Sequence, residues 1–228
     1  MSVRAEAGRV AAVAWKDLTT ERRSKANFNA VLFLAALMLL MFGFALGPDT
    51  ATLRTAAAGI VWLTVLFSGN LAFHRSYQTE LEGGALEMLL LYPGSRSAIF
   101  LGKLLANLAF VLLIEAVLIP IAVVLYDIPL GRETVLVPLV VFLGTLGFVT
   151  LGTFYASMAS RSRAREVLLP LLLFPMLVPI LIAAVEATGA LLGGDLMGDS
   201  GSWIRLLIAF DVIFLGAAMA AFGAVIEE

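Results

Sequence analysis

Two carboxylates stand inside apolar runs long enough to cross a bilayer, and they are the best candidates in this sequence for chemistry. Glu115 lies in the run 98–118 and Asp211 in the run 203–225, and both fall in the outer half of their spans. A carboxylate at membrane depth is costly, so we expect it to be paired, protonated or facing water. Glu115 and Asp211 could therefore line a translocation path or pin helices together by hydrogen bonds. For Asp211, pairing with Arg205 or with a neighbouring helix is the structural alternative. A third carboxylate, Glu186, ends the fifth run and is expected to be interfacial.

Other chemistry is missing from the sequence. There is no cysteine, and the one histidine, His74, stands where a span is expected to end, without a second ligand beside it. The chain has no phosphate-binding GxxxxGK[ST] loop, no HExxH and no GxSxG. We therefore expect no metal site and no enzyme activity, with any ATP hydrolysis in a separate chain.

An acidic stretch, residues 74–97, interrupts the apolar sequence. Its carboxylates are Glu80, Glu82 and Glu87, interleaved with leucines that include Leu86 and Leu89. This spacing predicts a short amphipathic helix that ends at Pro93-Gly94. Such a helix can dock on the lipid interface or on a soluble partner, and repulsion from an anionic leaflet favours the partner.

The composition is that of a polytopic membrane protein. Of its 228 residues, 61% are hydrophobic and 14% are charged, and the mean hydropathy is +1.00. A net charge of −2 argues against a nucleic-acid partner. We expect an all-α fold in one domain, residues 1–228. Its basic start, residues 1–27, is predicted to be an interfacial helix on the lipid surface rather than a cleaved signal.

Six apolar runs are near the length that crosses a bilayer. They are residues 28–46, 56–73, 98–118 with an extension to 126, 134–157, 167–185 and 203–225. The connections are short except for 74–97 and a glycine-rich loop, 186–202, to which the sequence assigns no role. Twelve of the fifteen Lys and Arg residues are on the side of the membrane where the two termini and the acidic stretch are expected. Because cytoplasmic loops are the basic ones, we expect both termini in the cytoplasm.

Small residues and prolines mark two of the spans. Gly144, Gly147 and Gly152 in the fourth span permit close approach of another helix. The fifth contains three prolines, Pro170, Pro175 and Pro179. Each removes an amide donor, which predicts a kinked or discontinuous hinge helix that faces protein or a cavity. Ordinary tolerance of proline in membrane helices is the alternative.

Three blocks of sequence resemble a known family. They are TELEGGALEMLLLYP followed by AIFLGKLLANL, then LGTFYASMASRSRAREVLLPLLLFPMLVPILIAAV, then FDVIFLGAAMAAFGAVIEE; the basic start WKDLTTERRSK also fits. They resemble the haem exporter protein B family, the membrane permease subunit of the ABC-type complex of cytochrome c maturation.

The resemblance implies an ABC-2-like permease in the bacterial inner membrane. Its implied partners are a cytoplasmic ATPase that carries ATP and Mg, a haem-handling membrane subunit, a small accessory subunit, a periplasmic haem chaperone and membrane lipid. Two copies of the permease and the ATPase are implied, with haem present at the level of the complex. By the same resemblance, Glu80, Glu82, Leu86, Glu87 and Leu89 belong to the coupling helix that meets the ATPase.

Three other functions stay open from the residues alone. The chain could be a membrane scaffold that anchors an ATPase without transporting anything. It could be an ABC-2 permease for a lipid or a polysaccharide. An integral-membrane enzyme is the most distant, because catalytic residues are missing.

Overall fold

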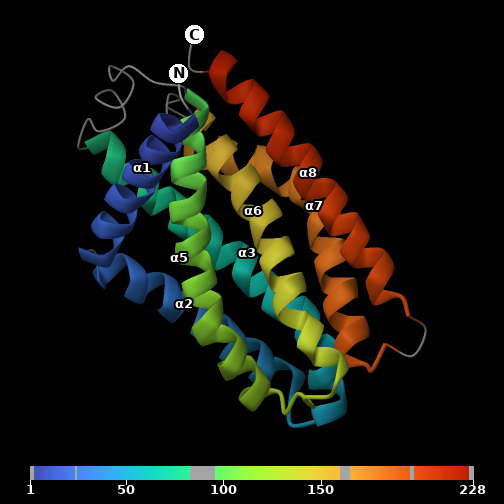
Figure 1. Ribbon diagram of the computed structural model, residues 1–228. Helices are drawn as coiled ribbons and strands as arrows, with labels where there is room; N and C mark the ends of the chain where they lie inside the picture. The colour runs from blue at the N-terminus through green and yellow to red at the C-terminus, as the bar shows by residue number, and fades with distance from the viewer. Residues whose placement is uncertain (1–2, 24, 83–95, 160–164, 196–197, 226–228) are drawn as a thin grey trace.

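The computed structural model describes residues 3–23, 25–82, 96–159, 165–195 and 198–225, and these form an all-helical bundle (Figure 1). The α-helices are α1 (Val3–Arg23), α2 (Lys25–Leu46), α3 (Thr50–Glu82), α5 (Arg96–Leu125), α6 (Val137–Ala159), α7 (Arg165–Leu192) and α8 (Ser200–Val225), and a 3-10 helix, η1 (Glu133–Leu136), precedes α6. The predicted all-α fold is confirmed.

Six of the described helices are long and apolar enough to cross a membrane. Their spanning segments are Lys25–Leu46, Thr50–His74, Ser97–Leu125, Glu133–Ser157, Leu173–Leu192 and Ser200–Phe222. All six predicted spans are therefore present. The predicted interfacial segment at the start forms α1, a separate helix that precedes the first span.

The chain enters and leaves the bundle at the same end (Figure 1). We call this the terminal end, and the other the opposite end, where residues 126–132 and 193–199 connect the helices. α6 is the central helix and packs against α3, α5, α7 and α8. α2 packs against α3 and α5 on one flank, and α1 lies along the terminal half of α5.

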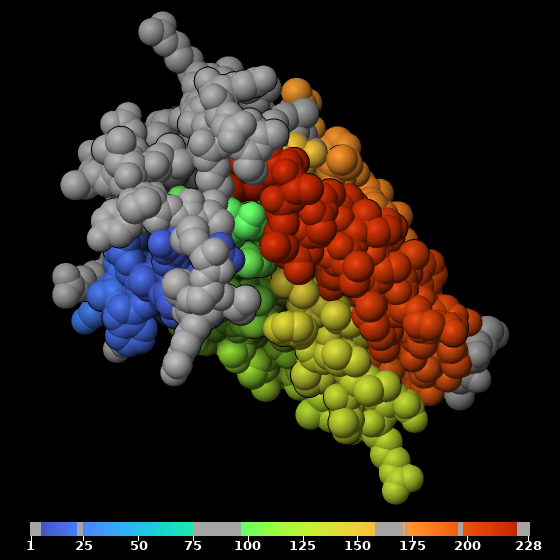
Figure 2. Space-filling model, turned by 45° about the horizontal axis from the view of Figure 1, so that its top comes forward, coloured from blue at the N-terminus to red at the C-terminus, as the bar shows by residue number. Residues whose placement is uncertain are grey.

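The outer helices present apolar side chains to the surroundings. Figure 2 shows α8, in red, exposed along much of its length. Val212 and Ile213 of α8 are 68% and 61% exposed, and Phe44 of α2 is 81% exposed. Surfaces this apolar are what a bilayer solvates, which agrees with six membrane-spanning helices.

Two large apolar clusters, and a small one of Phe100, Ala218 and Phe222, fill the interior of the described helices. The larger joins α3, α5, α6, α7 and α8 and contains Phe73, Phe148 and Leu177. The smaller joins α2, α3 and α5 around Leu39, Leu118 and Tyr126. In the second cluster the Tyr126 hydroxyl donates a hydrogen bond of 2.8 Å to the Leu39 carbonyl oxygen, so its polar end is satisfied while its ring is buried.

Aromatic rings lie directly on glycines where α3 meets α6. A Cβ on Gly144 would lie 2.3 Å from the Trp62 ring, and one on Gly152 would lie 2.1 Å from the Phe73 ring. The reverse contact also occurs, since a Cβ on Gly69 of α3 would lie 2.3 Å from the Phe148 ring. The prediction that glycines in the fourth span permit close helix approach is confirmed.

Aspartates begin the helices at the opposite end. Asp49 accepts hydrogen bonds from the Thr52 hydroxyl and the Ala51 amide before α3, and Asp195 accepts them from the Ser200 hydroxyl and amide before α8. These bonds stabilise the charged carboxylates and lower the pKa of both below the ordinary aspartate value. Because each carboxylate has a lower pKa in the folded than in the unfolded chain, the stabilisation from capping is fully present at a pH above the ordinary aspartate pKa. It is lost as the pH falls through the pKa of the folded protein.

Three sequence predictions need correction. The prediction of a long glycine-rich loop over residues 186–202 is wrong. α7 continues to Leu192 and α8 begins at Ser200, which leaves only 193–199 as a connection. Glu186 misled the assignment, because one exposed carboxylate on a helix does not end it. The second span ends at His74, within one residue of the prediction, but the stretch 74–97, predicted as a loop with its own short helix, begins as a continuation of α3 to Glu82. Finally, α7 is one helix across Pro170, Pro175 and Pro179, so it is not discontinuous; its bending stays a prediction.

We predict that Gly152→Ala destabilises the bundle. The added methyl group meets a buried Phe73 ring that is 1% exposed and cannot move aside, and overpacking of this kind costs about 1–3 kcal/mol. Thermal unfolding of the detergent-solubilised protein measures the effect. Gly216→Ala on α8 is the matched control, because nothing lies within 4 Å of its added Cβ. An unchanged melting temperature for Gly152→Ala would contradict the ring-on-glycine contact, whereas Phe73→Leu in the Gly152→Ala background should restore stability.

Candidate functional site: carboxylates on the two faces of α6

The structure describes only some of the predicted coupling residues. Glu80 and Glu82 lie in the last turn of α3. Leu86, Glu87 and Leu89 lie outside the described residues, as does the predicted end at Pro93-Gly94. The amphipathic helix therefore stays a prediction. What the structure adds is that the first part of the acidic stretch, from His74 to Glu82, continues α3 without a break.

Glu115 is buried between α5 and α6. It is 2% exposed, and the Thr145 hydroxyl of α6 donates a hydrogen bond of 2.6 Å to its Oε1. Its Oε2 has no hydrogen-bond partner among the described residues. Glu115 thus fits the helix-pinning role, because it joins two helices through a side-chain bond in an apolar interior.

Asp211 is buried on the other side of α6. It is 5% exposed, and neither carboxylate oxygen has a hydrogen-bond partner in the described part of the chain. The alternative of pairing with Arg205 is wrong: Arg205 is exposed and donates to the Ser202 hydroxyl at 3.1 Å. Six residues place two side chains on different faces of a helix, which is why the pair cannot form within α8.

The depth of Asp211 also differs from the prediction. The sixth span is Ser200–Phe222, so Asp211 is at its middle rather than in the outer half. The reason is that α8 begins three residues before the predicted start. Glu115 does lie beyond the middle of Ser97–Leu125, toward the opposite end.

The two carboxylates meet α6 at nearly the same level. Glu115 bonds to Thr145, and a Cβ on Gly147 would lie 2.6 Å from Asp211 Oδ1. Residues two apart differ by about 3 Å along a helix and point about 200° apart. The structure therefore places Glu115 and Asp211 on opposite faces of α6 and does not bring them together. They cannot share a proton directly, and each acts within its own helix pair.

α6 carries further polar groups toward the terminal end. Asn107 of α5 donates to the Thr153 hydroxyl at 3.0 Å, and the buried Thr150 hydroxyl has no partner among the described residues. These hydroxyls were not recognised in the sequence, because threonine is common in apolar helices. Their signal is the recurrence of threonine in the fourth span at Thr145, Thr150 and Thr153.

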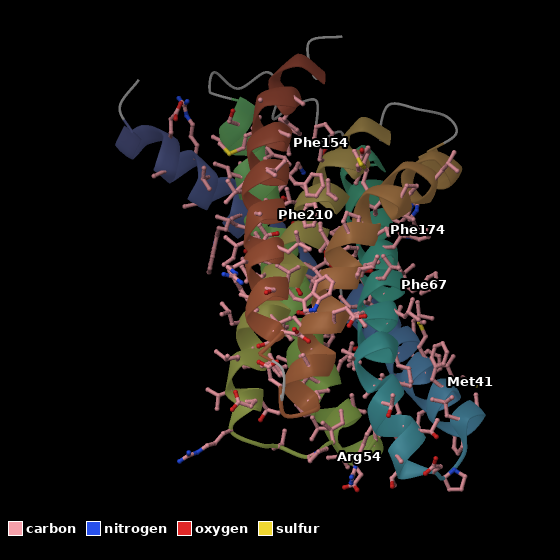
Figure 3. All side chains as sticks on the ribbon, turned by 90° about the vertical axis from the view of Figure 1, so that its right-hand side faces the viewer. Met41, Arg54, Phe67, Phe154, Phe174 and Phe210 are labelled. Carbon is pink, nitrogen blue, oxygen red and sulfur yellow. The ribbon has the colours of Figure 1, made fainter. Side chains whose placement is uncertain are left out.

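The prolines of α7 lie in different surroundings. Pro175 is exposed and Pro179 is half-buried, while the side chain of Pro170 is outside the described part. Figure 3 shows Phe174 of α7 beside Phe67 of α3, with ring centroids 6.1 Å apart. The expectation that this span faces protein is therefore correct for one side only, since Pro175 and its neighbour Met176 point outward.

The sequence did not reveal how firmly α1 is held. Asp17 Oδ2 lies 3.8 Å from Lys103 Nζ, and Lys103, which the sequence count places on the cytoplasmic side, is only 3% exposed. A Cβ on Gly102 would lie 2.6 Å from Val13 Cβ, so α1 and α5 are in backbone contact. Nearby, burial raises the pKa of Glu21, although the Asn27 side chain donates a hydrogen bond to its carboxylate. α1 is thus part of the bundle, and its interfacial position stays a prediction. Trp15, 68% exposed on its outer side, is the residue that fits the headgroup prediction.

No group of three or more His, Cys, Asp or Glu side chains within the described ranges could hold a metal ion. Exposed apolar helices, a closely packed centre and isolated buried carboxylates define an integral membrane protein of the polytopic helical class. A sequence model described as CcmB protein matches residues 9–228, and the chain belongs to this family.

Characterised relatives cover most of the chain. Heme exporter protein B of Pseudomonas aeruginosa is 28% identical over 200 residues, which is 88% of this chain and 89% of that protein. Heme exporter protein B of Haemophilus influenzae is 30% identical over 177 residues, 76% of this chain and 80% of that protein. The protein of the same name from Paracoccus denitrificans is 30% identical over 172 residues, 75% of this chain and 78% of its own length. The resemblance identified from the sequence is confirmed at the level of the family.

We predict that Asp211→Asn stabilises the protein, because it replaces a buried carboxylate without a described partner by a neutral group of the same size. The expected gain is on the order of 1–3 kcal/mol, measured by thermal unfolding in detergent. Glu115→Gln is the matched variant. It keeps the bond to Thr145 and should change stability by less than about 1 kcal/mol. A loss of stability in Asp211→Asn would mean that the carboxylate has a partner outside the described chain.

Proposed function

We propose that this chain is the membrane permease subunit of an ABC-type complex for cytochrome c maturation. In this proposal a separate cytoplasmic ATPase hydrolyses ATP. The permease couples that step to haem export, or to release of a haem-loaded chaperone, on the periplasmic side of the bacterial inner membrane. The observation that carries the proposal is the match to the CcmB family over residues 9–228, with relatives named Heme exporter protein B aligned over most of their own length.

The course of α3 supports a coupling role for the acidic stretch. α3 extends eight residues beyond the end of its span at His74, which is about 12 Å of helix. Displacement of the segment after Glu82 would therefore be transmitted along a continuous helix into the membrane. There α3 contacts α6 through the Trp62 and Phe73 rings, and it contacts α7 through the Trp62 indole, which donates to the Thr188 hydroxyl at 3.0 Å.

The residue inventory supports a division of labour among subunits. Haem iron is held in proteins by histidine or cysteine, and in some by methionine or tyrosine. This chain has eight methionines and four tyrosines but no cysteine and a single histidine, so it cannot supply a pair of histidine or cysteine ligands. We propose that haem is bound by a haem-handling membrane subunit and passed to a periplasmic chaperone. A small accessory subunit and two copies each of permease and ATPase complete the proposed complex. Both termini are proposed to be cytoplasmic, on the basis of the lysine and arginine count.

Purification from native membranes tests the assignment. The chain is tagged, solubilised gently and purified, and the co-purifying subunits are identified while ATP hydrolysis is assayed. Recovery of a phosphate-binding-loop ATPase together with a haem-containing membrane protein is the expected result. An ATPase without the haem protein would favour a lipid or polysaccharide permease, and normal haem attachment in a deletion strain would favour it further. Absence of any ATPase would overturn the coupling proposal.

A transporting subunit and a scaffold differ in what they need from the buried carboxylates. A conducting route lined by Glu115 and Asp211 should fail in Glu115→Gln and Asp211→Asn, which keep the shape of the bundle. If cytochrome c assembly continues in both variants while the ATPase stays bound, the chain anchors the ATPase and transports nothing through this region.

We predict that Glu82→Lys combined with Glu87→Lys abolishes cytochrome c assembly while membrane insertion is retained. Reversing both charges would repel a partner surface that is complementary to carboxylates, and such repulsion costs several kcal/mol. Haem-stained cytochrome c measures the outcome, and membrane fractionation checks insertion. Glu6→Lys on α1, at the same end of the bundle, is the control for added positive charge. Normal assembly in the double variant would remove these residues from the coupling site.

A second prediction concerns the proline hinge. Pro175→Ala with Pro179→Ala restores the amide donors of α7 and favours a straight helix. We expect ATP hydrolysis to continue while cytochrome c assembly falls at least about tenfold, a loss of about 1.4 kcal/mol of coupling. Pro48→Ala, in the exposed connection between α2 and α3, is the control and should behave as the unmodified protein. Coupled activity that equals the control would leave the two prolines as packing features.

A further inference from the structure

A cavity of about 320 Å³ lies between four helices near the opposite end of the bundle. We call it the acyl cavity. Its wall comes from α3, α5, η1, α6 and α7 and from the connection that follows α5. The residues that form it are Ala57, Ala58, Val61, Trp62, Ile119, Ala122, Val123, Ile128, Leu130, Thr134, Val135, Val137, Pro138, Val141, Thr188 and Leu192. It is about twice the size of an apolar cavity that holds one benzene molecule.

The wall is apolar, and its few polar groups are already bonded. The Trp62 indole donates to the Thr188 hydroxyl, and the Thr134 hydroxyl donates to the Gly131 carbonyl oxygen. The wall contains no charged side chain and no histidine, cysteine, methionine or tyrosine. It therefore offers neither an iron ligand nor a cation for propionates, so haem is a poor fit. A hydrocarbon chain forms no hydrogen bonds and therefore fits an apolar wall of this kind well.

The rim of the cavity carries apolar side chains that are highly exposed. Leu130 and Val135 are 73% and 77% exposed, which would be costly in water but not against lipid. Between them in the sequence, Arg132 is exposed, and no hydrogen bond or ion pair of its side chain occurs within the described ranges. Arg54 differs, since its guanidinium is held by the side chain and carbonyl oxygen of Asp127 (its position is labelled in Figure 3). Arg132 is thus the cation available at the rim.

We propose that the acyl cavity binds one acyl chain of a phospholipid, with the lipid phosphate at Arg132. The chain enters past Leu130 and Val135 and extends toward Trp62, and the guanidinium pairs with the phosphate at the interface. The lipid is a constituent of the subunit that touches α3, α5, α6 and α7 at once, whatever the complex transports. This inference does not depend on the proposed function, and either can fail alone.

Quenching of Trp62 fluorescence by brominated phospholipid tests the proposal directly, because Trp62 is in the cavity wall. Trp15→Phe with Trp203→Phe leaves Trp62 as the one tryptophan. This variant of the full chain is reconstituted in vesicles of anionic phospholipid with a rising fraction of bromine-labelled acyl chains. We expect strong quenching although Trp62 is only 2% exposed. Adding Ala122→Leu fills the cavity, and the quenching should fall at least about twofold.

Two matched controls separate cavity lipid from the surrounding bilayer and from misfolding. A variant that keeps only Trp203, which is outside the cavity wall, reports ordinary lipid contact and should be insensitive to Ala122→Leu. Arg132→Gln should raise the lipid fraction needed for half-maximal quenching of Trp62 about fivefold, the effect of one arginine near a charged lipid surface. Arg205→Gln, an exposed arginine on α8 at the same end, should leave it unchanged.

Three outcomes would overturn the proposal. Weak quenching of Trp62 with normal quenching of Trp203 would mean that no lipid chain enters. Equal quenching with and without Ala122→Leu would mean that bromine reaches Trp62 from outside. Cross-linking between two copies through Val135→Cys, with loss of Trp62 quenching on dimer formation, would assign the cavity to a second copy of the chain.

Discussion

The contact between α3 and α6 is the interaction on which the rest of the bundle depends. Within a bilayer the hydrophobic effect does not hold helices together, because lipid is as apolar as leucine, so close packing and hydrogen bonds must do so. Here each helix offers glycine to the aromatic rings of the other: Trp62 lies on Gly144, Phe73 on Gly152, and Phe148 on Gly69. α5, α7 and α8 pack on the remaining sides of the same central helix.

That close packing explains the state of the buried carboxylates. Asp211 sits against Gly147, where a side chain would collide with its Oδ1, so the glycine makes room for the carboxylate. Glu115 is held on the other face by the Thr145 hydroxyl. Because α6 separates the two groups, a path that used both would have to pass around this helix or move it.

The sequence predicted what composition and length decide. The all-α fold, six spans and glycine contacts in the fourth span all follow from apolar runs and small residues. What it missed depends on tertiary contacts. Glu186 looks like the end of a helix, yet the helix continues because Ala187 and Leu191 on its other side are fully buried. The pairing of Asp211 with Arg205 looked plausible from proximity in sequence, but helical geometry separates them. The cavity beside Trp62 is formed by four helices that are distant in sequence, so no local sequence pattern predicts it.

The contact of α1 with α5 has a consequence for the order of assembly. α1 leaves the ribosome first, but the surface that receives it, around Gly102 and Lys103, is synthesised about 80 residues later, and domains form as their parts become available. Until then the face of α1 that carries Val13 lacks the surface that covers it in the bundle. Its basic residues and exposed Trp15 suit a helix that waits at the headgroups. Docking of α1 thus has to wait for the third span, so the first helix to be made cannot reach its final position before α5 does.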